Sequence, residues 1–340
     1  MKIAIHPSKS DFSSDWIAYC EQQHISFKII DCYSSTIVQD VEDCDIVLWH
    51  HHHTNAKDVL FAKGLLFALE QSGKIVFPNF NTAWHFDDKV GQKYLLEAIH
   101  APIPKNYVFY DKLTALDWVG KVDFPKVFKL RGGAGSTNVK LIRTKKEARN
   151  IIRKAFNKGF KSYDKWGDLQ RNFKSFKSNK DYVAVLKSIR RLFMSTQFEK
   201  TVGNEKGYAY FQEFIPDNDH DTRVIVIGNK AFAIKRMVNK GDFRASGSGI
   251  IEYDHSLINL DCIKVAFDVT KKMEGQCVAF DFVFDKNKAP LIVEINYGFA
   301  HKSYKECPGY WDENLQWHKG QFNSTHWIID ELVSKYILKK

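Results

Sequence analysis

Short apolar runs alternate with amphipathic stretches over the first 80 residues. The runs lie at 1–5, 27–32, 43–49 and 74–79, and each has the length and composition of a buried strand. Between them, "SSDWIAYCEQQ" (13–23) and residues 56–72 show helical spacing, and Gly73 is typical of a helix end. This alternation predicts a small open α/β sheet. No GxGxxG turn follows any of the strands, which disfavours dinucleotide binding.

The next region combines a glycine loop with amphipathic helices. A helix is expected near 87–100, and "APIP" (101–104) closes it. "FPKVFKLRGGAGSTNVKLI" (124–142) predicts a strand, a glycine loop and a second strand. Apolar residues at helical spacing then predict a helix around 148–156 and another around 182–193, on either side of a polar basic stretch.

Two hairpins are predicted in the last region, which begins near Tyr208. "TRVIVIGNKAFAIKRMV" (222–238) turns at Gly228-Asn229. "CVAFDFVF" (277–284) and "PLIVEIN" (290–296) form the second hairpin. If these two strands pair antiparallel about Asn287-Lys288, Asp281 lies directly opposite Glu294.

Three oxygen-bearing side chains would then share one face of the sheet. Glu294 and Asn296 are two residues apart in a strand and therefore project together, and Asp281 faces Glu294. Two adjacent carboxylates repel each other unless they share a proton or a cation. A set of oxygen donors without His or Cys favours Mg²⁺ or Mn²⁺ over zinc. The alternative is a strand-end carboxylate paired with a nearby lysine.

Positive charge and backbone donors precede this region in the chain. Lys129 ends an apolar strand, and "RGGAGS" (131–136) follows at once, so backbone N–H groups beside a lysine could bind phosphates. The loop is not a Walker A loop, because no GK[ST] closes it. Taken alone, it also fits an ordinary glycine turn. Asp221 and Arg223 begin a later strand, and arginine suits contact with phosphate or carboxylate.

Charge and cysteine content narrow the class of protein. The 340 residues carry a formal net charge of +10, but residues 140–206 hold 19 Lys and Arg against 6 Asp and Glu. The basic character thus belongs to one segment, which indicates either a local anionic partner or a solvated lysine-rich surface. RNA binding is disfavoured because no RNP or KH pattern occurs. Six scattered cysteines without a CxxC pair suit reduced thiols in a cytoplasmic protein, and no spanning helix is expected.

The order of these segments resembles that of ATP-grasp ligases, in the branch of ribosomal-protein S6 glutamate ligases and glutathione synthetases. The segments are "DDKVGQKYLL", "FKLRGGAGSTNV", "FQEFI", "DTRVIVIG", "KRMVNKGDFRASGSG" and "AFDFVFDKNKAPLIVEIN". The resemblance spans roughly 79–297 and implies an α+β ATP-grasp fold. It predicts a pre-ATP-grasp α/β domain at 1–105, a small subdomain at 106–207 with a basic insert at about 145–206, and a large subdomain at 208–340.

The same resemblance implies a set of ATP and metal contacts. Lys89 and Lys129 resemble the two family lysines on the phosphate and adenine sides, and Arg223 and Arg244 resemble the phosphate-contacting and acyl-phosphate-stabilising arginines. The remaining ATP contacts by resemblance are the loop Gly132, Gly133, Ala134, Gly135 and Ser136, the adenine linker Gln212, Glu213, Phe214 and Ile215, and the ribose ligand Asp221. The magnesium set is Asp281, Glu294 and Asn296. Two departures from the family pattern are Leu130-Arg131, where many relatives have proline, and "FRASGSG" (243–249), which lacks the family's asparagine.

The implied activity is ADP-forming ligation of a small-molecule carboxylate to an amine through an acyl phosphate. "GYWDENLQW" (309–317) also resembles proteins of surface-polysaccharide assembly, which suggests a sugar- or uronic-acid-linked substrate, with an acidic glycan or nucleotide-sugar at the basic insert. The aromatic residues there fit either sugar stacking or a packed core. An amino-acid or peptide ligase and a silent ATP-binding module are the alternatives, and relatives suggest a homodimer. A metal site at His50–His53 is disfavoured because adjacent residues rarely converge on one ion, and a loop that lines the substrate mouth is the alternative.

Overall fold

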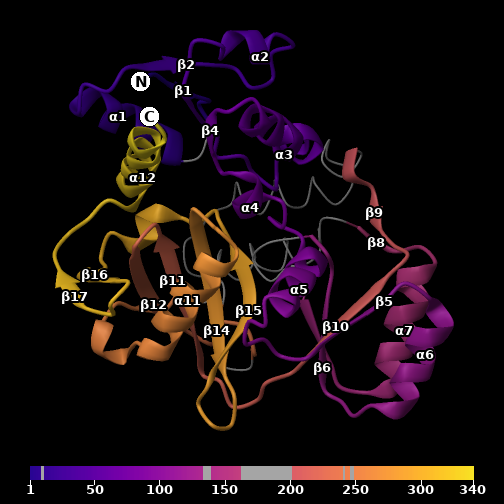
Figure 1. The fold of residues 1–340 in the computed structure, drawn as a ribbon. Helices are drawn as coiled ribbons and strands as arrows, with labels where there is room; N and C mark the ends of the chain where they lie inside the picture. Colours follow the sequence, from indigo (N-terminus) through magenta and orange to yellow (C-terminus); the bar gives the residue numbers. More distant parts are fainter. Residues whose placement is uncertain (9–10, 133–138, 162–200, 240–241, 246–248) are drawn as a thin grey trace, which may run out of the picture. The chain divides into compact units, whose positions relative to one another are not determined.

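The computed structural model describes residues 1–8, 11–132, 139–161, 201–239, 242–245 and 249–340 (Figure 1). The chain forms two compact units. The first consists of residues 1–86, 94–103 and 217–340, and the second of residues 87–93 and 104–216. The N-terminal segment and the C-terminal third thus belong to one compact unit, whereas the division into three domains remains a prediction.

A four-stranded parallel sheet of order β2-β1-β3-β4 begins the first unit. Its strands are β1 (Ile3–Ile5), β2 (Phe27–Ile29), β3 (Ile46–Leu48) and β4 (Ile75–Phe77). The connecting helices are α1 (Asp11–Gln22), α2 (Ile37–Asp40), α3 (Ala56–Gln71) and α4 (Phe80–Ala83). The small open α/β sheet expected from the sequence is therefore confirmed, and Gly73 follows α3 with a φ of 90°.

A larger sheet of order β15-β14-β11-β12-β16-β17, with β13 paired to β12, forms the rest of the first unit. Its strands are β11 (His220–Ile227), β12 (Lys230–Met237), β13 (Ile251–Glu252), β14 (Cys277–Phe284), β15 (Pro290–Asn296), β16 (Gly309–Asp312) and β17 (Trp317–Lys319). Its helices are η1 (His255–Leu257), α11 (Leu260–Lys272), η2 (His301–Tyr304) and α12 (Ser324–Lys339). Both predicted hairpins, β11–β12 and β14–β15, are present.

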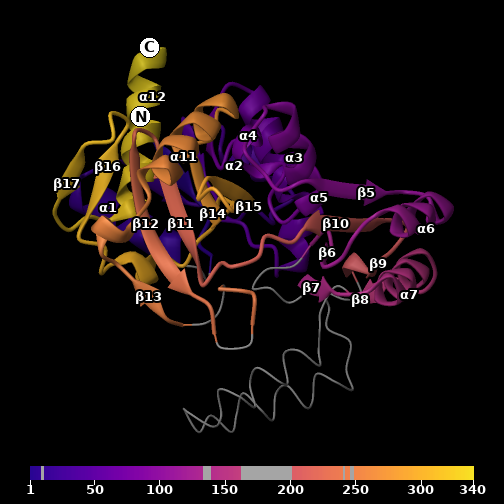
Figure 2. The ribbon, with the colours of Figure 1, turned by 90° about the horizontal axis from the view of Figure 1, so that it is seen from below.

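Strand periodicity gives this sheet two different faces. Val224 and Val226 pack with α11, which lies along one face of the sheet in Figure 2. Ile225 and Ile227 point to the opposite face and pack with residues of β1, β3, α1 and α12. Helices α1 and α12 lie side by side, which brings the two ends of the chain into the same unit (Figure 1).

The second unit is built on an antiparallel sheet of order β5-β10-β6-β7. Its elements are β5 (Asn106–Phe109), α6 (Lys112–Lys121), β6 (Lys126–Lys129), β7 (Val139–Ile142), α7 (Lys145–Phe156), β8 (Phe160–Lys161), β9 (Asn204–Glu205) and β10 (Ala209–Glu213). Helices α6 and α7 bury their apolar faces against the sheet. Helix α5 (Lys89–Ala98) begins in this unit and continues into the first.

Two further expectations concern the whole chain. All six cysteines are free and buried, which agrees with the prediction of reduced thiols. Within the described ranges, every helix is too short or too polar to cross a lipid bilayer.

Candidate active site

Two acids and two arginines gather on one face of the larger sheet, where the apolar residues of that face end. Strands β11, β12 and β14 place Asp221, Arg223, Arg236 and Asp281 on the same face as Ile225 and Phe232. The register explains the grouping, because Asp221 lies opposite Arg236 and Arg223 lies opposite Asp281. We call these four residues the acid–arginine cluster.

Paired hydrogen bonds hold the acid–arginine cluster together. Arg223 donates from Nε and Nη2 to the two oxygens of Asp281, at 2.6 and 2.7 Å. Arg236 donates in the same manner to Asp221, with an Nε–Oδ1 distance of 2.6 Å, and its Nη2 also lies 3.0 Å from Asp281 Oδ1. Arg236 therefore links the two carboxylates, and such charge-assisted pairs fix the side chains in one geometry.

The two carboxylates of the acid–arginine cluster differ in their affinity for a proton. Burial raises the pKa of Asp221 to about 6, and the nearby charge of Asp281 adds to the effect. Burial also acts on Asp281, but Arg223 and Arg236 outweigh it and hold the pKa of that carboxyl well below its usual range. Asp281 therefore stays ionised at neutral pH, as a metal ligand must.

Glu294 and Asn296 lie next to the acid–arginine cluster on β15. Glu294 is the direct partner of Asp281, as predicted, and Asn296 pairs with Ala279 on the next stretch of β14. Both side chains are half-buried, and Asn296 Oδ1 accepts a hydrogen bond from the Gly298 amide at 2.9 Å. The register shifts between Asp281 and Phe282, so a β-bulge lies at this point.

The donor set of Asp281, Glu294 and Asn296 fits a hard divalent ion. All three offer oxygen, and a carboxylate can accept about four hydrogen bonds or metal contacts, so Asp281 keeps acceptor capacity beyond its arginine contacts. The three carboxylates and two guanidinium groups in this neighbourhood carry one net negative charge. That charge suits a Mg²⁺ ion that arrives with a nucleotide phosphate better than a free ion.

Two of the four consecutive histidines, His50 and His51, pack against Tyr297, which directly follows β15. His50 stacks on Phe12 with 3.9 Å between ring centroids, and its Nε2 would lie 3.0 Å from a Cβ at Gly298, so this close approach suits glycine. The Tyr297 hydroxyl donates to the His51 carbonyl at 2.6 Å. Burial lowers the pKa of His51 to about 3. His50 and His51 thus serve packing, and no metal-binding group of three His, Cys, Asp or Glu occurs among the described residues.

The two predicted lysine contacts and the predicted adenine linker lie in the second unit. Lys89 and Lys129 are both buried, at 4% and 6% exposure. In the linker, the Gln212 side chain donates to Asn106 at 2.9 Å, and Glu213 pairs with Lys126 at 3.0 Å. The Glu213 amide donates to the Lys105 carbonyl at 2.8 Å. The two buried lysines place positive charge inside this unit.

A carboxylate occupies the first donors of the glycine loop. Glu205 accepts hydrogen bonds from the backbone amides of Arg131 and Gly132, at 3.0 and 2.9 Å, and from the Tyr208 hydroxyl. The Arg131 guanidinium pairs with Asp88 at 2.6 Å. These two amides thus bind an anionic oxygen in this structure. The predicted phosphate ligands Gly133, Ala134, Gly135 and Ser136 lie outside the described residues.

Three other predicted features are placed as follows. Arg244 pairs with Asp242, two residues earlier, at 2.8 Å, and both side chains are about one-third exposed. Most of the basic insert lies outside the described residues. In the C-terminal segment, Trp311 is buried and contacts the half-buried Trp317 at a tilted angle, and the half-buried Trp327 stacks on Phe322, so these aromatic side chains pack against one another.

Three residues of the site are not among the predicted ATP and metal contacts. Arg236 could have been found, since a two-residue turn at Gly228-Asn229 already places it opposite Asp221. Tyr304, buried and within hydrogen-bond reach of Arg223, had no local pattern that revealed it. Glu205 contacts the glycine loop at Arg131, from which it is 74 residues away in the chain, and residue spacing in the sequence does not indicate a contact over that separation.

Comparisons with known proteins agree with this geometry. Residues 192–307 match the RimK-like ATP-grasp domain. The chain is 21% identical over 231 residues to the alpha-aminoadipate–LysW ligase LysX of Saccharolobus solfataricus, which covers 68% of each chain.

Solved structures show the same fold over nearly the whole chain. A RimK-domain ATP-grasp protein from Sphaerobacter thermophilus superposes with a TM-score of 0.57 and 14% identity, covering 98% of this chain and 100% of that one. D-alanine–D-alanine ligase from Bacillus anthracis, complexed with ATP, gives a TM-score of 0.57 and 14% identity over 100% and 99% of the two chains. The chain therefore has the α+β ATP-grasp fold, and its residues 192–307 are similar to the RimK-like ATP-grasp domain.

Proposed function

We propose that the protein uses ATP to activate a small-molecule carboxylate as an acyl phosphate and joins it to an amine, releasing ADP and phosphate. The observation that carries this proposal is the pairing of Asp281 with Glu294 beside Arg223 and Arg236. This arrangement combines metal-ligand oxygens with fixed positive charge. Catalysis of phosphoryl transfer depends mainly on that combination of metal ligands and positive charge.

The reaction has two steps. First, a carboxylate oxygen of the substrate forms a bond to the γ-phosphorus of ATP, and the bond from that phosphorus to the ADP oxygen breaks. Second, the amine nitrogen attacks the acyl carbon, the carbon–oxygen bond to phosphate breaks, and the nitrogen loses a proton. No protein nucleophile is needed, because the acyl phosphate is itself reactive.

The proposal gives each group of residues a role. In the first unit, Arg223 and Arg244 would stabilise the negative charge of the transferring phosphoryl group and the acyl phosphate, and Asp221 would bind the ribose. In the second unit, Lys89, Lys129 and the glycine-loop amides would contact phosphates, and the Gln212–Ile215 backbone would meet adenine. Asp281, Glu294 and Asn296 would hold Mg²⁺ or Mn²⁺, which neutralises phosphate charge when bound.

Asp281 has a further role through its two arginines. Its carboxylate orients Arg223 by two short hydrogen bonds and contacts Arg236. The guanidinium groups are therefore fixed in place before any substrate arrives. Preorganised charge of this kind lowers a barrier more than charge that must reorient during the reaction.

The relatives and the sequence bear on the class of the substrate. A relative that acts on alpha-aminoadipate supports an amino-acid or carboxylate substrate for this chain. A sugar-linked substrate rests on the "GYWDENLQW" segment alone, in which Trp311 is buried and Trp317 is half-buried. An acidic polymer at the basic insert and a homodimer stay predictions, as does a cytoplasmic location.

Trapping the acyl phosphate tests the activity without knowledge of the amine. ATP, Mg²⁺, hydroxylamine and a panel of carboxylic acids should yield a hydroxamate together with ADP. Formation of AMP would indicate adenylate chemistry and contradict the proposal. Absence of any acid-dependent nucleotide cleavage would favour the silent ATP-binding module.

A further inference from the structure

Positive charge is concentrated on and around helix α7 in the second unit. Residues 140–161 contain nine Lys and Arg against one acid, Glu147. All nine basic residues are exposed. The Glu147 carboxylate accepts a hydrogen bond from the Arg143 backbone amide at 2.8 Å, so it serves the start of the helix. This short stretch therefore presents its positive charge to solvent with little compensation.

The helix arranges three of these cations in one row. We call Lys146, Arg149 and Arg153 the α7 basic face. At about 100° per residue the three lie within an arc of about 60°, and at about 1.5 Å per residue they span about 10 Å. Ala148 and Ile152 lie on another side of the helix, where they pack against the sheet. The α7 basic face is thus a continuous row of cations on the solvent side.

The cations of the α7 basic face are unpaired. No acid in the described part of the chain forms an ion pair with any of the three, and Arg153 donates to the neutral Asn150 side chain at 3.3 Å. Arg149 is three residues from Lys146 and four from Arg153, and like charges at these spacings destabilise a helix. The sequence therefore keeps a row of charges that opposes folding, which indicates a role outside the fold.

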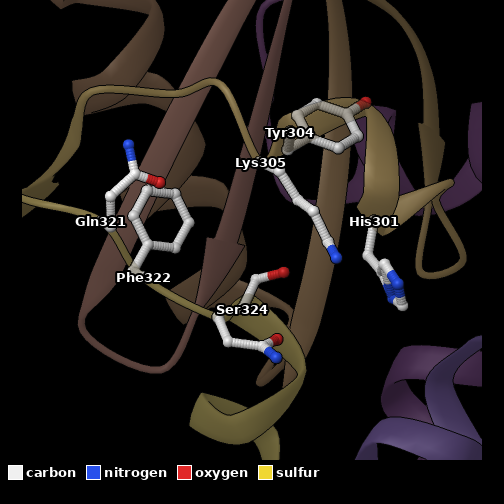
Figure 3. Close-up of a pocket in the computed structure, with 7 residues that line it drawn as sticks. His301, Tyr304, Lys305, Gln321, Phe322 and Ser324 are labelled. Atoms are coloured by element: carbon white, nitrogen blue, oxygen red, sulfur yellow. The ribbon is translucent and has the colours of Figure 1, made fainter.

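Two other places with positive charge show the contrast. Arg223 and Arg236 form ion pairs with Asp281 and Asp221 in the acid–arginine cluster. The cavity between η2 and the start of α12, shown in Figure 3, has a single lysine, Lys305, among its lining residues. The α7 basic face differs from both, because several unpaired cations lie side by side.

The α7 basic face lies on the side of the sheet away from the predicted nucleotide contacts. Phe128 and Phe211 point toward the helices and pack with Ile152 of α7. Successive residues of a strand project to opposite faces, so Lys129 and Gln212 project to the other face of the sheet. The cations of α7 are therefore not placed to neutralise ATP, and the proposed ligase chemistry gives them no role.

We infer that the α7 basic face docks the protein reversibly on an anionic lipid surface. Such a surface is a plane of diffuse negative charge, which attracts clusters of about 4–8 Lys and Arg. Lys145, Lys154 and Lys158 adjoin the face and bring the number of exposed cations into that range. Docking through this side of the sheet leaves the opposite, nucleotide-facing side open. The inference does not depend on the proposed ligase activity.

Shape and composition favour a bilayer over a linear polyanion. Proteins that bind single-stranded nucleic acids hold the backbone in a groove and stack bases on aromatic side chains. An exposed helix is convex, and the two aromatic residues of 140–161, Phe156 and Phe160, pack in the core of the unit. The apolar side of α7 is also packed against the sheet. Attachment therefore rests on charge alone, without insertion of apolar side chains, and is sensitive to salt.

Sedimentation of the full 340-residue chain with lipid vesicles tests this inference without ATP or substrate. Phosphatidylcholine vesicles with about 30 mol% phosphatidylglycerol should bind the protein at about 0.1 M salt, and pure phosphatidylcholine vesicles should not. About 0.5 M salt should release it. A variant that combines Lys146→Gln, Arg149→Gln and Arg153→Gln should bind about 100-fold more weakly, because each cation near an anionic surface contributes about a fivefold factor.

A matched triple variant separates this face from net charge. Lys264→Gln, Lys271→Gln and Lys335→Gln remove the same number of charges from exposed positions of α11 and α12, and this variant should bind within about threefold of wild type. The α7 triple variant should melt at or above the wild-type temperature, since it relieves repulsion between like charges. Both triple variants should retain hydroxamate formation in the absence of vesicles.

Three results would overturn the inference. The first is a lack of salt-sensitive binding to the anionic vesicles, and the second is equal loss of binding in the two triple variants. The third is binding of duplex DNA or polyuronate, in place of vesicles, that is lost in the α7 triple variant, because this would assign the face to a linear polyanion.

Discussion

Arg236 is predicted to hold the acid–arginine cluster together, and Arg236→Met tests this role. The guanidinium is 9% exposed, binds Asp221 through two hydrogen bonds and lies 3.0 Å from Asp281. Its removal leaves the buried Asp221 carboxylate without its hydrogen-bonded cation, whereas Asp281 keeps its paired hydrogen bonds with Arg223. Loss of one member of a buried pair typically costs about 3–5 kcal/mol of unfolding free energy.

Arg244→Met is the matched control for this loss. Arg244 also pairs with an aspartate, but both side chains are about one-third exposed, so the expected loss is below about 1 kcal/mol. Adding Asp221→Asn to Arg236→Met removes the stranded charge. We expect the double variant to recover about 2 kcal/mol or more of what the single variant loses.

Urea unfolding followed by fluorescence, with linear extrapolation to water, measures these free energies. The order of stability should be wild type and Arg244→Met first, the double variant next and Arg236→Met last. Equal losses in the two arginine variants would refute the reasoning. So would a double variant that is no more stable than Arg236→Met.

Three further predictions follow from the same geometry. Glu294→Ala should lower acid-dependent ADP release at least about a hundredfold with an unchanged melting temperature, because it removes one proposed metal ligand. The control Glu252→Ala, which changes an exposed residue of β13, should leave ADP release unchanged. Unchanged turnover in Glu294→Ala would mean that the metal site lies elsewhere. Because the folded-state pKa of Asp221 is about 6, above its unfolded value, the folded state takes up the proton first as the pH falls. Wild type should therefore gain about 1 kcal/mol of stability over Asp221→Asn between pH 7.5 and 5.5, and a loss in that interval would contradict this assignment. Glu205→Gln should lower the KM for ATP about fivefold, because it removes the negative charge that competes with phosphate for the Arg131 and Gly132 amides. A raised KM would show instead that Glu205 supports nucleotide binding.

The strand pairing could be predicted from the sequence because turns and period-2 patterns are local. The turn at Gly228-Asn229 fixes the β11–β12 register, so Ile227 pairs with Lys230 as expected. Asp281 lies opposite Glu294 as predicted, but the register between this pair and the turn differs from the prediction. Near the turn, Phe284 pairs with Pro290, one residue out of the predicted register, and the bulge after Asp281 restores it. The pattern of side chains does not reveal such an extra residue.

The contacts between distant segments could not be predicted in the same way. Glu205 at the glycine loop and Tyr304 beside Arg223 come from segments whose approach depends on the packing of whole elements. The four histidines show the same limit. Their number suggested a binding role, whereas burial against Phe12 and Tyr297 determines what His50 and His51 do.

The most direct test of the central claim follows an oxygen atom from the acid to phosphate. An acid identified in the hydroxamate screen is labelled with ¹⁸O in its carboxylate and incubated with ATP, Mg²⁺ and hydroxylamine. If the carboxylate attacks the γ-phosphorus, the released inorganic phosphate carries one labelled oxygen and ADP carries none. Labelled AMP, or inorganic phosphate without label, would contradict an acyl-phosphate mechanism.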